Sequence, residues 1–107
     1  MDTASAPLTG KQKRYLKSLA HPLLPVVQLG KEGLSAQAIA AADVELTRHE
    51  LIKVKIGNNS GLEKEATAAA LTNATGGHLV QVIGKIVVLY RENPKREKEE
   101  RIRLPKA

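Results

Sequence analysis

The spacing of apolar residues along the chain predicts three helices and four strands. Helical spacing extends over about residues 9–20, 35–49 and 62–75, and strand-like runs occupy residues 25–29, 51–56, 79–83 and 86–90. The last two runs are separated by Gly84 and Lys85, which favours a tight hairpin. Helix–strand alternation that ends in a hairpin is typical of an α/β domain. We therefore expect one two-layer domain, in the order α-β-α-β-α-β-β, with a four-stranded mixed sheet.

Polar residues at the helix starts support these boundaries. Thr9 and Ser60 each precede a glutamine or glutamate by three residues, which is the spacing of a capping box. Ser35 is a favourable N-cap for the second helix. The third helix is expected to bury its small apolar side chains against the sheet: Leu62, Ala66, Ala69 and Ala70.

Length and composition then exclude several classes of protein. The chain has 107 residues, the size of one domain, and no cysteine, so disulfides and thiolate metal sites are excluded. It has no apolar run long enough for a transmembrane helix, and residues 1–7 do not form a secretory signal. We therefore expect a cytoplasmic protein with no membrane association, and we expect it to be a monomer.

The charge and the aromatic content narrow the choice of partner. Seventeen basic residues against 11 acidic ones give a net charge of +6, and a small basic domain most often binds a polyanion. Phe and Trp are absent, and the only aromatic rings besides histidine are Tyr15 and Tyr90. Domains that stack bases on a sheet need several aromatic side chains. We expect Tyr15 in the core, so nucleic acid would be held through phosphates and backbone amides.

The first helix carries basic residues and no acid. Like charges three or four positions apart on a helix repel one another, so stability does not favour the arrangement. The face is either simply solvated or bound to an anionic partner, and the absence of any acid favours the partner. The basic residues are Lys11, Lys13, Arg14 and Lys17. Lys53 and Lys55 share one face of the second strand, where they mark either an exposed face or a part of the same binding surface.

The turn from the first strand into the second helix has the composition of a phosphate site. Gly30, Lys31, Glu32 and Gly33 occupy it, and the helix begins directly after. A helix start offers unpaired N–H groups and the positive end of the dipole, and residues 34–42 contain no acid. Lys31 would add charge and Glu32 would oppose it. KH domains clamp a nucleic-acid backbone with a GxxG loop, although the same pattern by itself also occurs in simple turns.

Other chemistry is not indicated by the sequence. The three histidines His21, His49 and His78 lie far apart and lack the spacing of metal ligands. No nucleophile, carboxylate pair or nucleotide-binding fingerprint stands out. We therefore expect a protein that is not an enzyme and that uses no metal and no cofactor.

Six segments in order closely resemble one family, the CRM (chloroplast RNA splicing and ribosome maturation) domain in its stand-alone YhbY-like form. They are residues 21–23 (HPL), 25–27 (PVV), 30–34 (GKEGL), 49–55 (HELIKVK), 80–85 (VQVIGK) and 88–91 (VLYR). The resemblance extends from about residue 8 to residue 91, and residues 102–105 are similar to the family's ending. Glu32 in the loop and the neutral turn at residues 58–61 depart from the pattern.

The resemblance implies an RNA-binding domain whose GxxG loop contributes to binding. It also implies a fold like the C-terminal domain of bacterial translation initiation factor three, and association with ribosomal RNA or with precursors of the large ribosomal subunit. One copy without an obvious transit peptide fits the bacterial type, which assists ribosome assembly. On this basis the chain divides into residues 8–92 as the CRM-type domain, residues 93–107 as a solvated or partly helical charged tail, and residues 1–7 as a flexible N-terminus.

Two alternative functions remain open at this level. The mixed charges of the tail would also suit a protein-interaction module that docks on a ribosomal protein. The net charge alone would suit a sequence-independent DNA-binding protein.

Overall fold

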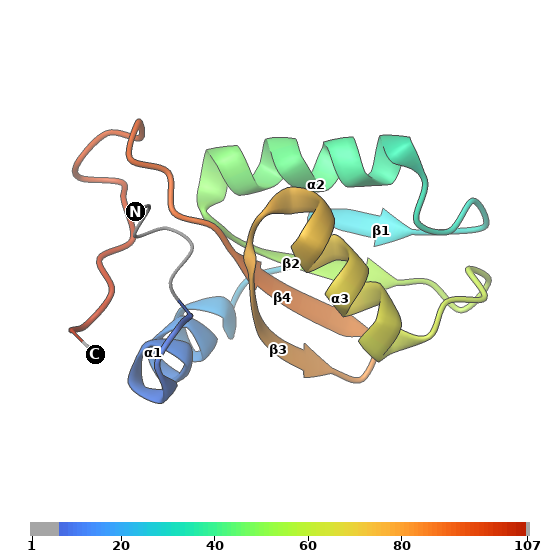
Figure 1. The fold of residues 1–107 in the computed structure, drawn as a ribbon, viewed down its shortest axis with the longest axis horizontal. Helices are drawn as coiled ribbons and strands as arrows, with labels where there is room; N and C mark the ends of the chain where they lie inside the picture. The colour runs from blue at the N-terminus through green and yellow to red at the C-terminus, as the bar shows by residue number, and fades with distance from the viewer. Residues whose placement is uncertain (1–6, 107) are drawn as a thin grey trace.

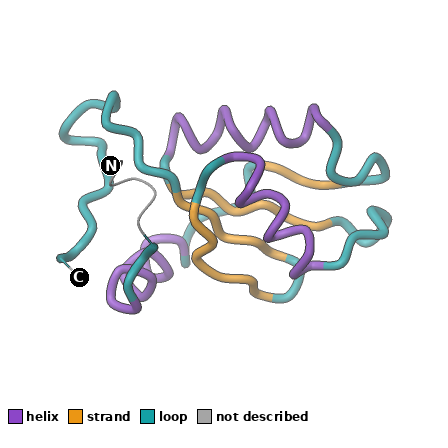
Figure 2. The backbone as a smooth tube through the Cα atoms, viewed as in Figure 1, coloured by secondary structure: helices purple, strands orange, loops and turns teal. Residues whose placement is uncertain are grey.

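The computed structural model describes residues 7–106 and contains seven elements in the predicted order (Figures 1 and 2). They are α1 (Gly10–Ala20), β1 (Val27–Leu29), α2 (Ala36–His49), β2 (Leu51–Ile56), α3 (Lys64–Thr75), β3 (His78–Ile83) and β4 (Ile86–Tyr90). The four strands form one sheet in the order β1-β2-β4-β3. β1 runs parallel to β2, and the other two pairings are antiparallel, so the predicted mixed α/β sheet is confirmed.

The two faces of the sheet are covered unequally. α2 and α3 cover one face, where Leu46 and Leu71 pack on Ile52, Val54 and Leu89. α1 packs on the opposite face and covers only one end of it, burying Leu16 and Ala20 against β2, β3 and β4. The central strand β4 is buried on both faces, as its continuous apolar run predicts. The two-layer description therefore fits α2, α3 and the sheet, and α1 adds a partial layer on the other side.

Two of the three predicted helix starts are confirmed and one is wrong. Thr9 and Gln12 form the capping box of α1, and the Ser35 hydroxyl accepts the Ala38 amide at 3.1 Å. At α3 the N-cap is Glu63, whose carboxylate accepts the amides of Glu65 and Ala66 at 2.9 Å each. Hydrogen bonds with the Glu65 side chain, and then with these two amides, lower the pKa of Glu63 to about 2.

Ser60 is therefore not a capping residue. Its hydroxyl donates to the Gly57 carbonyl at 2.8 Å and accepts the Leu62 amide at 3.2 Å, which closes the turn before α3. A Ser-x-x-Glu spacing suits such a turn as well as a capping box, because a short hydroxyl bonds to whichever backbone group lies nearest. The helix begins two residues later than predicted as a result.

The buried face of α3 also differs from the prediction. Ala66 and Ala69 are exposed, and Leu62 and Ala70 are half-buried. The fully buried residues are Thr67, Ala68, Leu71 and Thr75. Alanine fits either side of a helix, so an alanine-rich segment leaves its orientation to its few larger side chains. In α3 that side chain is Leu71, which is fully buried.

The Tyr15 side chain lies outside the core, contrary to the prediction. It is 38% exposed, whereas Leu16 beside it is fully buried. α1 covers only one end of the sheet face, so the helix buries a narrower stripe than its apolar arc suggests. The other tyrosine, Tyr90, is buried in the cluster that includes Leu16 and Val88. Burial, and then the nearby carboxylates of Glu50 and Glu92, raise the pKa of Tyr90 to about 12.

Residues 93–106 pack on the domain instead of extending into solvent. They form turns and no helix, and Ile102 and Leu104 pack against the cluster around Tyr90. The Gln12 side chain in α1 donates to the Pro105 carbonyl at 3.1 Å. The prediction of a partly helical extension is therefore wrong, and that of a solvated one holds only in part, because residues 97–100 are exposed while Arg96, Ile102 and Leu104 contact the domain. The domain boundary at residue 92 stays a prediction. Residues 1–6 and 107 of the predicted termini lie outside the described residues.

A buried carboxylate holds this segment in place. Glu50 follows α2 with a φ of 64° and is fully buried. Its carboxylate accepts the Asn93 amide at 2.8 Å, the Ile102 amide at 2.9 Å and the Arg96 guanidinium at 2.9 Å. A buried charge that lost these partners would be strongly destabilising, so Glu50 couples the C-terminal segment to the end of α2.

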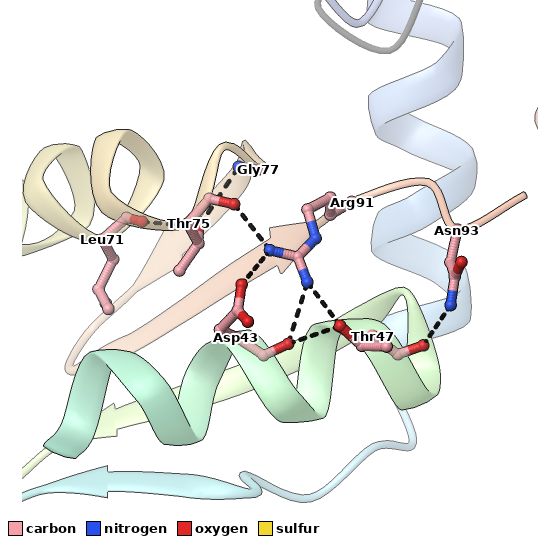
Figure 3. Close-up of polar contacts among 7 residues, drawn as sticks. All are labelled: Asp43, Thr47, Leu71, Thr75, Gly77, Arg91 and Asn93. Atoms are coloured by element: carbon pink, nitrogen blue, oxygen red, sulfur yellow. Dashed lines mark hydrogen bonds and ion pairs between the residues drawn. The ribbon is translucent and has the colours of Figure 1, made fainter. Parts of the chain in front are cut away.

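Arg91 joins the end of β4 to both helices of the covered face (Figure 3). Its guanidinium donates to the Asp43 carboxylate at 2.5 Å and to the Thr75 carbonyl at 2.7 Å. It also donates to the Thr47 hydroxyl at 2.8 Å. All of these contacts lie within the protein, so Arg91 acts in the fold and its charge is neutralised there.

Candidate nucleic-acid interface

The loop at residues 30–35 protrudes from one end of the sheet (Figure 1). The Gly57 amide donates to the Leu29 carbonyl at 2.8 Å, which fixes the end of β1 beside the end of β2. The bend itself is closed by the Gly33 amide, which donates to the Gly30 carbonyl at 2.8 Å. Gly33 has a φ of +68°, a left-handed conformation that favours glycine. Lys31 and Glu32 at the tip are both exposed, so the bend is open to solvent.

Several backbone donors of this loop have no acceptor among the described residues. In the described part of the chain, the N–H groups of Lys31, Glu32 and Leu34 have no hydrogen-bond partner. Ser35 then caps α2, whose first turn contains no acid. The positive end of the helix dipole is therefore not neutralised from within the helix. Exposed amides at an acid-free helix start form an arrangement that binds phosphate.

Further basic residues lie at the same end of the sheet. The loop at residues 57–63 and the β3–β4 turn lie at this end with the 30–35 loop (Figure 1). Lys85 in the turn donates to the Asn58 side chain at 2.9 Å. Lys55 is exposed on the sheet face opposite α2 and α3, in register with Gln28 and Ile86. The open face thus carries positive charge next to the loop.

The basic helix α1 lies at the other end of the sheet (Figures 1 and 2). Its four basic residues Lys11, Lys13, Arg14 and Lys17 are all exposed. The molecule is 39 Å long in its longest dimension, and the structure does not bring these residues together with the loop. A ligand that contacts both would have to cross the open face of the sheet.

Lys53 and Lys55 have different surroundings, although they share one face of β2. The Lys53 amine donates to the carbonyls of Leu23 at 2.9 Å and His21 at 3.3 Å, so it holds the segment that follows α1. No such contact engages the Lys55 amine among residues 7–106. Lys53 therefore has a structural role in the fold. The exposed Lys55 amine is available to a ligand.

A groove lies between α1 and the open sheet face, and nothing in the sequence indicates it. Lys17 and Lys53 line it together with His21 and Gln81. A register shift between Leu79 and Gln81 turns the Gln81 side chain to this face. A bulge of this kind leaves no mark in the apolar pattern, so no sequence signal was available for Gln81.

The described residues form neither a metal-binding cluster nor a membrane-spanning helix. No group of three or more histidine and acidic side chains there is arranged to hold a metal ion. None of the three helices between residues 7 and 106 combines the length and the apolar character needed to cross a membrane.

Comparison with known proteins identifies the family. The profile of the CRS1 / YhbY (CRM) domain matches residues 8–91. The chain belongs to this family. It is 42% identical over 98 residues to the probable RNA-binding protein YqeI of Bacillus subtilis, covering 92% of this chain and 99% of that protein. It is 42% identical over 99 residues to a Haemophilus influenzae protein named RNA-binding protein, covering 92% of this chain and 96% of that one.

A solved structure agrees with the fold. The solution structure of the hypothetical protein SAV1595 of Staphylococcus aureus, described as a candidate RNA-binding protein, superimposes with a TM-score of 0.76. The two chains are 49% identical, and the match covers 92% of this chain and 99% of the other. The resemblance to the CRM family that the sequence motifs predicted is therefore confirmed, together with the α/β fold.

Proposed function

We propose that this protein binds RNA and holds its backbone at the loop of Gly30, Lys31, Glu32 and Gly33. Phosphate oxygens would accept the exposed amides of this loop and of the first turn of α2, and Lys31 would add a charge-assisted contact. Lys55 and the basic side chains of α1 would extend the contact across the open sheet face. The relatives named as RNA-binding proteins support RNA as the ligand.

One observation carries the proposal. The loop presents unpaired amides beside an acid-free helix start, and Lys31 and Glu32 at the tip of its bend are exposed. Had these donors been satisfied internally, the GxxG pattern would have been a simple turn.

We further propose ribosomal RNA, within precursors of the large ribosomal subunit, as the target in the cytoplasm. The support for this step is the family resemblance. The protein would then assist assembly without catalysing a reaction.

The test measures RNA binding by fluorescence anisotropy over a range of salt concentrations. Lys31→Ala should weaken binding several-fold and lower the salt slope by about one unit or less, because one phosphate contact is lost. Arg48→Ala is the matched control, since it removes the same charge at the far end of α2, where Arg48 pairs with Glu45 at 3.4 Å. Equal affinity and slope for Lys31→Ala and the original protein would reject the role of the loop.

The same assay separates the alternative functions. Equal affinity for RNA and duplex DNA at one salt concentration would favour the sequence-independent DNA-binding protein. A ribosomal association that survives nuclease treatment would favour docking on a ribosomal protein. Two basic residues of the tail are less available to such a partner, because Arg96 pairs with the buried Glu50 and Arg101 pairs with Glu92.

A further inference from the structure

The groove between α1 and the open face of the sheet has a mixed lining. Its volume is about 470 Å³, and it opens to solvent. The apolar part of the lining comes from Ala20, Val88 and Ile83. The polar part comes from Ser18, His21 and Gln81, with Lys17 and Lys53 as the cations. No carboxylate contributes to the lining.

Two features of the lining are unusual for a plain surface depression. Ile83, a large apolar side chain at the end of the edge strand β3, is 50% exposed. The half-buried Gln81 carboxamide makes no hydrogen bond with any residue from 7 to 106. The register shift after Leu79 places Gln81 opposite Val88, so its amide stands beside the apolar surface of the groove. An apolar floor beside one carboxamide that lacks a hydrogen-bond partner is suited to a flat ring with polar edges.

The position of the groove connects the two basic regions. Lys17 belongs to α1, and Lys53 is followed two residues later on the same face by Lys55, toward the loop. The Lys53 amine uses two of its three protons on the carbonyls of His21 and Leu23, which leaves one for a ligand. An RNA strand that ran from α1 to the loop would therefore pass over the groove.

We propose that this groove holds one unpaired RNA base. The Gln81 carboxamide would hydrogen-bond the edge of the base, Ile83 and Val88 would contact its face, and the adjoining phosphates would lie near Lys17 and Lys53. This inference rests on the proposed function, since it places one nucleotide of the same RNA. RNA-binding proteins often recognise splayed-out bases by their hydrogen-bonding edges. Here aliphatic side chains take the place of Phe, Tyr and Trp, none of which lines this groove.

The experiment measures anisotropy with single-stranded RNA octamers that carry an abasic residue at each position in turn. Binding of the original protein should weaken at one position of the series. Gln81→Met, which keeps the side-chain length and removes the amide, should weaken binding of the unmodified octamer about fivefold, the equivalent of one net hydrogen bond. With the octamer that is abasic at the sensitive position, Gln81→Met should bind about as weakly as the original protein does, because the base that Gln81 would contact is absent. Ile83→Ala should act in the same direction.

Asn73→Ala is the matched control, because Asn73 is an exposed amide on α3, which packs on the other face of the sheet. Circular dichroism melts of each variant show whether it folds. An abasic series without a sensitive position, or original affinity for both Gln81→Met and Ile83→Ala, would overturn the inference. If Lys31→Ala still weakened binding in that case, the proposed function would stand. Failure of the original protein to bind any RNA would reject the proposed function itself.

Discussion

At the scale of single residues, the charge at the tip of the loop decides how strongly the loop attracts an anion. Lys31 and Glu32 are adjacent and both exposed, so one attracts a phosphate and the other repels it. The structure gives Glu32 no ion pair among the described residues that would offset its charge. Under the proposed function, Glu32 should therefore lower the affinity of the loop for phosphate.

Neutralising Glu32 should strengthen RNA binding. We expect Glu32→Gln to bind about two- to fivefold more tightly at low salt, the effect of one exposed charge, and the gain should shrink as salt rises. Glu45→Gln makes the same change in net charge at the far end of α2 and should have a smaller effect. Anisotropy at two salt concentrations measures both. Weaker binding by Glu32→Gln would show that the carboxylate takes part in recognition.

At the scale of elements, the backbone of the loop depends on one of its two glycines. Gly33 adopts a left-handed conformation, whereas Gly30 does not, and an added Cβ at Gly30 would meet no atom within 4 Å. The two glycines of the GxxG pattern are therefore present for two different physical reasons. Gly33 is needed for the turn, and Gly30 leaves open space beside the exposed amides.

Replacing each glycine by alanine should separate these requirements. Gly33→Ala should lower the free energy of unfolding by about 1–2 kcal/mol, because an L-residue is strained there, and it should weaken RNA binding as the bend changes. Gly30→Ala should change stability by less than about 0.5 kcal/mol. Urea denaturation of both variants gives the comparison. Equal losses of stability would contradict the assigned backbone roles.

The elements were also what the sequence predicted best. Apolar spacing with Thr9 and Ser35 as caps located α1 and α2, and alternation in β2 identified its two faces correctly. The orientation of α3 was not predictable, because its alanines carry no preference for either side. The bulge before Gln81 was not predictable either, because both residues at it suit either face. The glycines and the acid-free helix start were enough to locate the loop. Its distance from α1 could not be predicted, because that distance depends on the order of the strands in the sheet.

At the scale of the whole molecule, the C-terminal segment is part of the folded unit. The sequence suggested a solvated tail because charges alternate there, and it gave no sign that Arg96 would pair with the buried Glu50 at 2.9 Å. Such a contact joins residues far apart in the chain and cannot be inferred from local pattern. Ile102 and Leu104 complete the cluster that buries Tyr90.

Removing residues 93–107 should therefore destabilise the domain by about 3–5 kcal/mol, because the Glu50 carboxylate would lose the partners that Asn93, Arg96 and Ile102 provide. The Tyr90 pKa should fall from about 12 toward its ordinary value near 10 as the ring becomes exposed. In the full chain the raised pKa of Tyr90 contributes stability below pH 10, which is lost as the pH rises toward about 12. Urea denaturation, and ultraviolet titration in a Tyr15→Phe background, provide the measurements. An unchanged stability and Tyr90 pKa would show that the segment is dispensable.

The central claim, that the loop amides hold RNA phosphate, is tested most directly by NMR titration of ¹⁵N-labelled protein with RNA. We expect the amide signals of Lys31, Glu32 and Leu34 to shift early and most, followed by those of residues on the open sheet face, with little change on the outer faces of α2 and α3. Shifts confined to those outer faces, with the loop amides unmoved at saturating RNA, would contradict it.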